Sequence, residues 1–420
     1  MCGHKAILRT VVARNPMRWP GEWNDPSYLR LLKGTAINCL LIESQNNLES
    51  VAAKAWQDGL EVVRSASLPS DVTVVTGEWP GVKLTQSGEL DLASAGPTGA
   101  PWVDSNGWRV RLAATLHPGN DIWVDANPTA PRLFPESYVL GVVDAAAYGG
   151  RWIITLDKRL AEDIAAQKQK ALDTWKKLTA AAGFFPAHKA WPDFPPEAVL
   201  GIISDFSGEN EFFSNELLNL VARSNQQYRI LLRGQVSQAS FAGLRAVLYS
   251  DTQAPSPDLQ KQILAFVEEG GMLISGPNWG ELAGGPSIGD GYPSYSQRTL
   301  GKGRLAIAKD DLADPFLVAH DATVLISHRY DLLRFWNGGA LASHYTMAPG
   351  RKEAIVQVLF YASGLPRSDV SVRVAGHYRA AKLWTLDRPT AGNVDMEIQK
   401  DAVELHLPAI SQYAAVELKA

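Results

Sequence analysis

The sequence predicts an α/β protein of several domains, and two observations support that prediction. Apolar runs of strand length alternate with helical segments between about residue 34 and about residue 363, which is typical of parallel β/α units. From about residue 366 the helical period stops, and short segments alternate apolar and polar residues, as antiparallel strands do. The length of 420 residues is consistent with about two to four domains.

The first region, residues 1–185, predicts an incomplete or degenerate β/α barrel of the TIM type. About five strands fall in its last ~150 residues, whereas a complete eight-fold barrel takes about 250 residues. An open α/β sheet is the alternative. The predicted strands are 36–43, 61–66, 72–77, 121–126 and 151–157, and the predicted helices are 48–60, 105–119, 136–150 and 159–183.

Residues 186–197 are rich in proline and predict a linker. The second region, 198–365, restarts the alternation and predicts a flavodoxin-like doubly wound sheet. Its predicted strands are 198–205, 228–234, 244–251, 272–277 and 303–311, with 355–363 as a last extra strand. The third region, 366–420, predicts a small antiparallel β domain of the sandwich type.

Composition excludes several classes of function. The net charge is −4 and no basic run is present, so we expect neither a nucleic-acid nor a membrane partner. Two cysteines, Cys2 and Cys39, exclude a disulfide framework and a multi-cysteine metal site. The histidines lack metal-ligand spacing and no nucleotide-binding glycine motif occurs, so we expect no metal and no cofactor.

The same reading bears on location. No apolar run reaches the ~18 residues that a transmembrane helix needs. The first twenty residues are a poor secretory signal because arginines interrupt the apolar stretch, so we expect a cytoplasmic protein. Secretion stays open if the natural start lies further upstream.

Four carboxylates follow predicted strands and are the candidate catalytic residues: Glu43, Glu78, Asp125 and Asp157. In β/α barrels the catalytic groups lie where strands meet their loops. Paired carboxylates at that edge can divide the roles that glycoside cleavage needs. The alternative is that these residues cap helices or bind loop backbone, as Asp and Glu often do after strands.

Tryptophan is concentrated in the first region, with ten of the 13 before residue 192. The segment 94–111 adds planar polar side chains to several of them. Aromatic faces bind the C–H faces of sugar rings, and Asp, Asn and Arg bind hydroxyls. The candidate substrate-binding residues are Trp79, Trp102, Asp104, Asn106, Trp108, Arg109 and Trp123. The alternative is a rigid loop whose tryptophans pack in the core while Asp104 and Asn106 cap a helix.

The later regions resemble a known family. AVLGIISD (198–205), LRAVLYSD (244–251), FVEEGGMLISGP (266–277) and GKGRLAIA (301–308) resemble the class I amidotransferase-like trimerisation domain of the β-galactosidases of glycoside hydrolase family 42. VELHLPAISQYAAVEL (403–418) resembles the last strands of those enzymes. Residues 198–420 contain no cysteine, so the amidotransferase nucleophile is absent.

The resemblance implies a carbohydrate ligand and a homo-oligomer such as a trimer. The family's barrel is about twice as long as the region here and carries two catalytic glutamates near the ends of its fourth and seventh strands. Neither glutamate aligns with this sequence. Two hypotheses follow: a glycoside hydrolase that uses paired carboxylates on a tryptophan-lined site, or a non-catalytic carbohydrate-binding or assembly protein derived from one.

Overall fold

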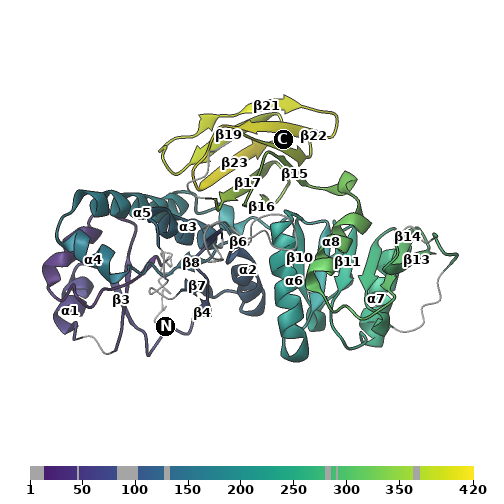
Figure 1. Ribbon diagram of the computed structural model, residues 1–420, viewed down its shortest axis with the longest axis horizontal. Coiled ribbons are helices and arrows are strands. Elements are labelled where there is room, and N and C mark those ends of the chain that lie inside the picture. The colour runs from purple at the N-terminus through teal and green to yellow at the C-terminus, as the bar shows by residue number, and fades with distance from the viewer. Residues whose placement is uncertain are drawn as a thin grey trace, which may run out of the picture.

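The computed structural model describes residues 14–44, 47–82, 103–126, 133–279, 285–289, 292–362 and 369–420. The chain is a mixed α/β protein, as the sequence predicts. Figure 1 shows an N-terminal unit in purple and blue beside a middle unit in green, with a C-terminal unit of yellow strands lying above both.

The N-terminal unit contains six parallel strands in two hydrogen-bonded groups, with orders β1-β2-β3 and β4-β7-β8. A bridge between Met17 and Ile154 joins the groups, so the strand order is β3-β2-β1-β8-β7-β4. A two-stranded ladder of β5 and β6 lies outside this order. The strands are β1 (Pro16–Arg18), β2 (Cys39–Ile42), β3 (Glu61–Arg64), β4 (Val72–Thr76), β5 (Gly81–Val82), β6 (Val103–Asp104), β7 (Asp121–Asp125) and β8 (Arg151–Trp152).

The barrel is not closed by backbone hydrogen bonds, because β3 and β4 do not pair within the described residues. The row of six strands nevertheless curves, so that its two ends approach each other. Arg14 reaches Glu61 on β3 at 2.9 Å, Asp71 before β4 at 2.9 Å and Asp121 on β7 at 3.2 Å. These carboxylates stand at the amino ends of strands from both ends of the order, so ion pairs bring those ends together.

The strand alternation divides the apolar side chains between two faces. The inner face packs Cys39, Leu41, Val63, Val72, Trp123 and Ile153 into one small cluster. The outer face packs Met17, Leu40 and Val124 against the helices. These are η1 (Pro26–Leu32), α1 (Glu49–Gln57), α2 (Gly107–Leu116), α3 (Pro135–Ala146), α4 (Lys158–Ala165), α5 (Gln169–Ala187) and η2 (Trp191–Asp193).

Two predicted boundaries in this unit differ from the structure. The helix predicted at 159–183 is divided into α4 and α5, because Gln167 adopts a left-handed φ of 57° that ends the first helix. The predicted linker is partly helical: α5 continues through Pro186 to Ala187, and η2 follows. Pro186 gives up one helical hydrogen bond, and α5 ends one residue later.

The middle unit is one sheet of order β10-β9-β11-β12-β14-β13. Its five parallel strands have the flavodoxin-like order 2-1-3-4-5, and β13 is antiparallel to β14. The strands are β9 (Leu200–Ser204), β10 (Tyr228–Leu232), β11 (Ala246–Tyr249), β12 (Met272–Ser275), β13 (Tyr295–Leu300) and β14 (Gly303–Ala308). The helices are η3 (Gly208–Asn210), α6 (Glu211–Arg223), η4 (Arg233–Gln235), η5 (Gln238–Phe241), α7 (Pro257–Glu268), η6 (Pro277–Trp279), α8 (Pro315–Ile326) and η7 (His328–Tyr330).

The C-terminal unit consists of two antiparallel sheets, with orders β15-β18-β22-β21 and β16-β17-β23-β19-β20. Their inner faces share one apolar core. The strands are β15 (Leu333–Trp336), β16 (Leu341–Met347), β17 (Glu353–Phe360), β18 (Val370–Ala375), β19 (Ala380–Thr385), β20 (Gly392–Asn393), β21 (Asp395–Ile398), β22 (Ala402–Leu407) and β23 (Tyr413–Lys419).

The strand predicted at 355–363 is assigned to the wrong sheet by the sequence. It is β17, and it pairs with β16 and β23 rather than with the middle sheet. Its alternate residues face two different cores: Val356 and Val358 enter the sandwich, whereas Ile355 and Leu359 pack on the N-terminal unit. A strand buried on both faces reads as a continuous apolar run, which is the pattern of a parallel-sheet strand.

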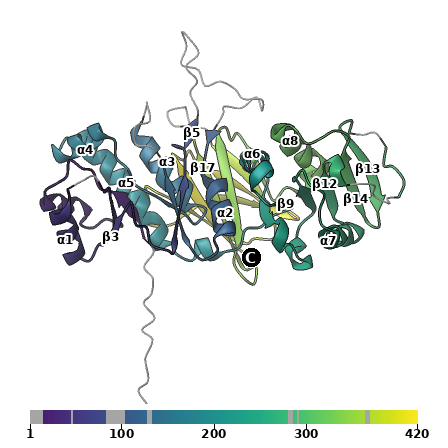
Figure 2. The same cartoon turned by 90° about the horizontal axis from the view of Figure 1, so that it is seen from below.

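The N-terminal unit contacts both other units. Trp108 and Leu112 on α2 enter the core of the middle unit, and Figure 2 shows α2 between the two. The Gln357 side chain on β17 donates to the Ala147 carbonyl at 2.8 Å, and the Tyr413 hydroxyl donates to Gln357 at 2.7 Å. Among the described helices, none is both long and apolar enough to cross a membrane.

Replacing Trp123 with alanine should destabilise the N-terminal unit by about 3–5 kcal/mol, because the side chain fills the interior between the strands and is fully buried. Urea unfolding followed by circular dichroism measures the loss. Trp56→Ala is the matched control: that side chain is 71% exposed, and its removal should change stability by at most about 0.5 kcal/mol. Equal effects of the two substitutions would contradict the interior role.

Candidate functional site

The carboxyl ends of the N-terminal strands hold a charged group centred on Arg18. Its Nε donates to Glu43 at 2.7 Å, and its two terminal nitrogens donate to both oxygens of Asp125 at 2.9 and 2.8 Å. Arg18 Nη1 also donates to Thr155 Oγ1 at 3.1 Å. We call Arg18, Glu43, Asp125 and Thr155 the Arg18 cluster. It brings together two of the four predicted catalytic carboxylates.

Strand alternation explains why these side chains meet. Arg18 pairs in register with Leu41, whose side chain faces inward. Glu43 and Asp125 each follow an inward residue, Leu41 and Trp123, by two positions, and so point to the same side. The side chains of Arg18, Glu43 and Asp125 are 19%, 23% and 32% exposed. The cluster is therefore half-buried and within reach of a ligand.

The electrostatics favour a fixed guanidinium with a surplus of negative charge around it. Burial disfavours the charge of Arg18, but hydrogen bonds and attraction from Asp125 and Glu43 outweigh it and raise the Arg18 pKa. One cation then faces two carboxylates. The bidentate pair with Asp125 also fixes the plane of the guanidinium, as Arg–carboxylate forks do.

Glu78 lies beside this cluster on a backbone held by Asn106. Gly77 N–H donates to the Asp125 carbonyl at 2.7 Å, which places Glu78 next to the end of β7. The Asn106 side chain accepts from Glu78 N–H at 2.9 Å and donates to the Glu78 carbonyl at 2.8 Å. The Glu78 side chain is exposed. Its backbone position is thus fixed while its carboxylate stays accessible.

The Asp144 carboxylate holds Asn106 in place by hydrogen bonds. One Asp144 oxygen accepts from the Asn106 backbone at 2.6 Å and from its side chain at 2.9 Å, and the other accepts from the Tyr361 hydroxyl at 2.6 Å. Asp144 is fully buried. Burial raises its pKa to about 6, although the hydrogen bonds from Tyr361 and Asn106 oppose the rise.

Asp157 and Trp79 both contact other protein groups. One Asp157 oxygen accepts from Leu160 N–H at 3.0 Å and caps α4, and the other accepts from the Tyr138 hydroxyl. Asp157 therefore serves as a helix cap, the alternative that the sequence left open. Burial and the Asp157 bond raise the Tyr138 pKa. Trp79 is half-buried and packs edge-on against Tyr138 and Trp152, with ring centres 5.4 and 5.0 Å away.

Three of the predicted binding residues are buried within the protein. Trp123 is 0% exposed inside the N-terminal unit, and Trp108 is 6% exposed against the middle unit. Asn106 is 0% exposed and binds Glu78 and Asp144. Asn106 precedes α2, yet its side chain makes no capping hydrogen bond.

Arg109 and Asp104 contact residues outside the Arg18 cluster. Arg109 stacks on the Trp108 ring, with 4.5 Å between the guanidinium carbon and the ring centre. Asp104 is in β6. Its charge acts on Arg223 of α6: burial lowers the Arg223 pKa, and attraction from Glu216 and Asp104 opposes that change. Trp102 lies outside the described residues.

The sequence analysis missed Arg18, Thr155, Tyr138 and Asp144. Arg18 belongs to a strand of three residues, too short to show a period. Thr155 could have been found by alternation, since it stands two positions after the inward Ile153. Asp144 is a lone carboxylate on the fully buried middle of α3, which is itself a signal of a polar network.

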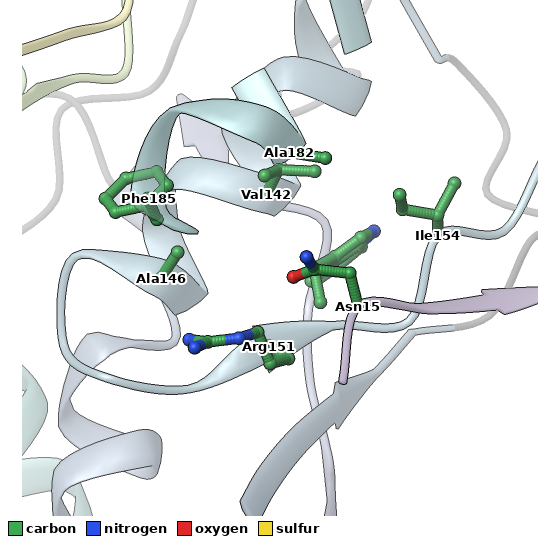
Figure 3. Close-up of a pocket in the computed structure, with 8 residues that line it drawn as sticks. Asn15, Val142, Ala146, Arg151, Ile154, Ala182 and Phe185 are labelled. Atoms are coloured by element: carbon green, nitrogen blue, oxygen red, sulfur yellow. The ribbon is translucent and has the colours of Figure 1, made fainter. Parts of the chain in front are cut away.

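Two hollows differ in what they can hold. Figure 3 shows a small one, lined by Asn15 and Arg151 with apolar side chains of α3 and α5, whose volume of about 10 Å³ fits about one water. A cleft of about 560 Å³ lies between the three units and includes Ser105 and Tyr361. Its volume is in the range of ligand sites. Among the described residues no group of three metal-ligating side chains occurs.

No protein-family model and no curated protein matches the chain. Solved structures do. An α-L-fucosidase, isoenzyme 2 from Paenibacillus thiaminolyticus, is 11% identical with a TM-score of 0.54, over 94% of this chain and 80% of that one. At that identity the likeness shows a shared fold and no more.

Two further structures are more distant. A β-galactosidase from Bacillus circulans sp. alkalophilus is 10% identical with a TM-score of 0.44, over 72% of this chain and 60% of that one. A rhamnosidase from Novosphingobium sp. PP1Y is 10% identical with a TM-score of 0.49, over 89% of this chain and 38% of that one. The chain thus spans well under the full length of both proteins.

Stability should rise as the pH falls through the Asp144 pKa. The folded carboxyl has a pKa of about 6 against an ordinary 3.8, so between these values the folded chain binds more protons than the unfolded chain. Relative to pH 8, the gain from this group should be about 1 kcal/mol at pH 5. Urea unfolding of the natural chain and of Asp144→Asn at both pH values measures this contribution of Asp144 to the free energy of unfolding. An unchanged pH dependence in the variant would refute the assignment.

Proposed function

We propose that this chain is a glycoside hydrolase-like protein that binds a carbohydrate at the Arg18 cluster. The observation that supports the proposal is the meeting of Arg18, Glu43 and Asp125 at the carboxyl ends of β1, β2 and β7, partly open to solvent. Catalytic and binding groups lie at this edge of β/α barrels. The fold shared with a fucosidase is consistent with it.

The cluster offers donors and acceptors that suit sugar hydroxyls. Asp125 uses both oxygens on Arg18, so its part is to orient the guanidinium. Glu43 binds Arg18 through one oxygen, and the other oxygen makes no hydrogen bond within the described residues. That oxygen accepts from a hydroxyl of the ligand in our proposal. Trp79 beside Glu78 is the remaining described aromatic candidate at this edge.

For hydrolysis we assign the two roles to Glu43 and Glu78. Glu43 holds the Arg18 guanidinium through one oxygen, and we assign it the part of nucleophile or base. Glu78 is exposed on a backbone that Asn106 holds in place, and we assign it the part of proton donor. Around the edge the order is Glu43, Arg18, Asp125, Glu78, because β4 pairs with β7.

Carbohydrate binding without hydrolysis is the second candidate, and specific observations favour it. Asp125 and Asp157 each have both oxygens engaged by protein groups, and Trp108 and Trp123 are buried. Under this candidate Asp125 and Asp157 serve to orient protein groups. Under this candidate Glu43 and Glu78 bind hydroxyls only. The homo-oligomer that the family resemblance implies stays a prediction for light scattering.

Glu78→Gln should lower turnover of a susceptible glycoside by about 10²–10⁴-fold, because the amide cannot donate the proton that the leaving group needs. Initial rates over a panel of chromogenic α- and β-glycosides identify the substrate first. Glu43→Gln should give a comparable loss. Glu209→Gln, an exposed glutamate in the middle unit, is the control and should be unaffected.

The same experiment separates the two candidates. Glycan-array binding that Glu43→Gln weakens, with no turnover of any glycoside, would establish the binding protein and exclude the hydrolase. Turnover that survives both glutamine substitutions would refute the assigned roles. If the chain shows no binding to the array and no turnover of any glycoside in the panel, the proposal of a carbohydrate site at the Arg18 cluster is refuted.

A further inference from the structure

The middle unit has a second charged feature at the opposite edge of its sheet. A hollow of about 180 Å³ opens at the amino ends of β11, β12 and β14. Four cationic side chains line it: Arg245, Lys302, Arg304 and Arg329. We call this hollow the basic pocket. Ligands of open α/β sheets bind at the carboxyl ends of the strands, so the basic pocket is independent of the site expected from the fold.

The sheet register brings these cations together from distant parts of the chain. Ala246, Met272 and Arg304 stand in one row across β11, β12 and β14. Arg245 directly precedes β11, and Lys302 lies in the turn before β14. Arg329 comes from η7, which follows α8. Convergence of three separate segments makes a shaped pocket rather than a charged stretch of surface.

The cations of the pocket have no carboxylate partner in the part of the chain that the structure describes. Within the described residues none of the four cations has a carboxylate within 4.0 Å. Arg245 and Arg329 both lie over the ring of Tyr330, at 5.1 and 4.6 Å from its centre. Bringing like charges onto one ring costs free energy, and a bound anion would offset that cost.

A structural role accounts for one of the cations. Basic side chains complement the carbonyl ends of helices, and α7 and α8 both end at this edge. Arg304 donates to the Leu325 carbonyl of α8 at 3.1 Å, which is such a contact. Arg245, Lys302 and Arg329 make no side-chain hydrogen bond within the described part of the chain. Helix capping therefore leaves three cations unexplained.

The floor of the basic pocket is backbone that only glycine permits. A Cβ atom at Gly303 would lie 2.1 Å from the Val267 carbonyl oxygen and 2.2 Å from that of Gly271. Any other residue would force β14 away from α7. Glycine therefore lets β14 pack closely on the end of α7 beside the pocket, whose rim carries the four cations.

We propose that the basic pocket binds a tetrahedral oxyanion, a phosphate or sulfate group, either free or as the ester of a small molecule. Guanidinium forks bind such oxygens with paired charge-assisted hydrogen bonds. The volume of about 180 Å³ is below the ~300 Å³ at which drug-sized sites begin, so the anionic group itself is the recognised part. The ligand carries two or more negative charges to match the four cations.

Isothermal titration calorimetry on the full chain tests the proposal. The probes are inorganic phosphate, inorganic sulfate, a hexose 6-phosphate and a hexose 6-sulfate, each at an ionic strength held constant with sodium chloride. We expect saturable one-to-one binding of at least one probe. Tighter binding of an ester than of its free ion identifies a small-molecule ester as the ligand, and the reverse identifies the free ion.

Two variants locate the binding. Arg245→Gln and Arg329→Gln replace exposed side chains, and each should weaken binding about tenfold because one charge-assisted contact is lost. Arg298→Gln, an exposed arginine on β13 outside the pocket, is the matched control and should bind as the natural chain does. Circular dichroism melting confirms that all three fold.

Two results would overturn the proposal. The first is the absence of heat beyond that of sodium chloride for all four probes. The second is binding that the Arg245 and Arg329 variants retain in full, or that Arg298→Gln weakens equally, since either would show general attraction to surface charge. Binding of a hexose ester at the Arg18 cluster would be unchanged in the Arg245 and Arg329 variants, so the variants distinguish this proposal from the proposed function.

Discussion

The N-terminal unit depends on two arginines that flank one strand of three residues. Arg14, just before β1, binds Glu61, Asp71 and Asp121 at the amino ends of the strands, and Arg18, the last residue of β1, binds Glu43 and Asp125 at the carboxyl ends. Within the described residues β3 and β4 share no ladder, so backbone hydrogen bonds do not close the order. At the amino edge the ion pairs of Arg14 link the two ends of the order instead. An unpaired member of such a half-buried group would be costly, because each carboxylate has given up water.

The C-terminal unit is part of the same construction. β17 contributes one face to the sandwich and the other to the N-terminal core, so its apolar residues are shared between two units. Tyr361, just after β17, donates to Asp144, which holds Asn106 and through it the backbone of Glu78. A residue more than 200 positions away thus fixes a strand end at the candidate site. Proteins usually pair buried polar groups in this way because an unsatisfied carboxylate in the interior is expensive.

How far the sequence could predict this structure depends on the length of each element. The sequence predicts strands of four or five residues, such as β2, β4 and β7, where the structure has them, together with the carboxylates at or just after their ends. β1 was missed because three residues show no period, and Arg18, the centre of the candidate site, was missed with it. β17 was given to the wrong sheet because burial on both faces erases the alternation that marks an antiparallel strand. Pairing between distant segments leaves no local trace.

The tryptophans show what the aromatic excess of the first region does in the fold. Trp19, Trp23, Trp123 and Trp152 are each at most 4% exposed, so the aromatic excess of the first region fills the space between short strands and their helices. Short strands expose little apolar surface of their own, and large side chains supply the burial that they lack. The accessible chemistry at the strand ends is then charged rather than aromatic. Because Arg18 binds the carboxylates at the ends of β2 and β7 and also faces solvent, its loss would affect folding and binding together. Glu78 is exposed and outside these ion pairs, so its substitution reports on function more directly.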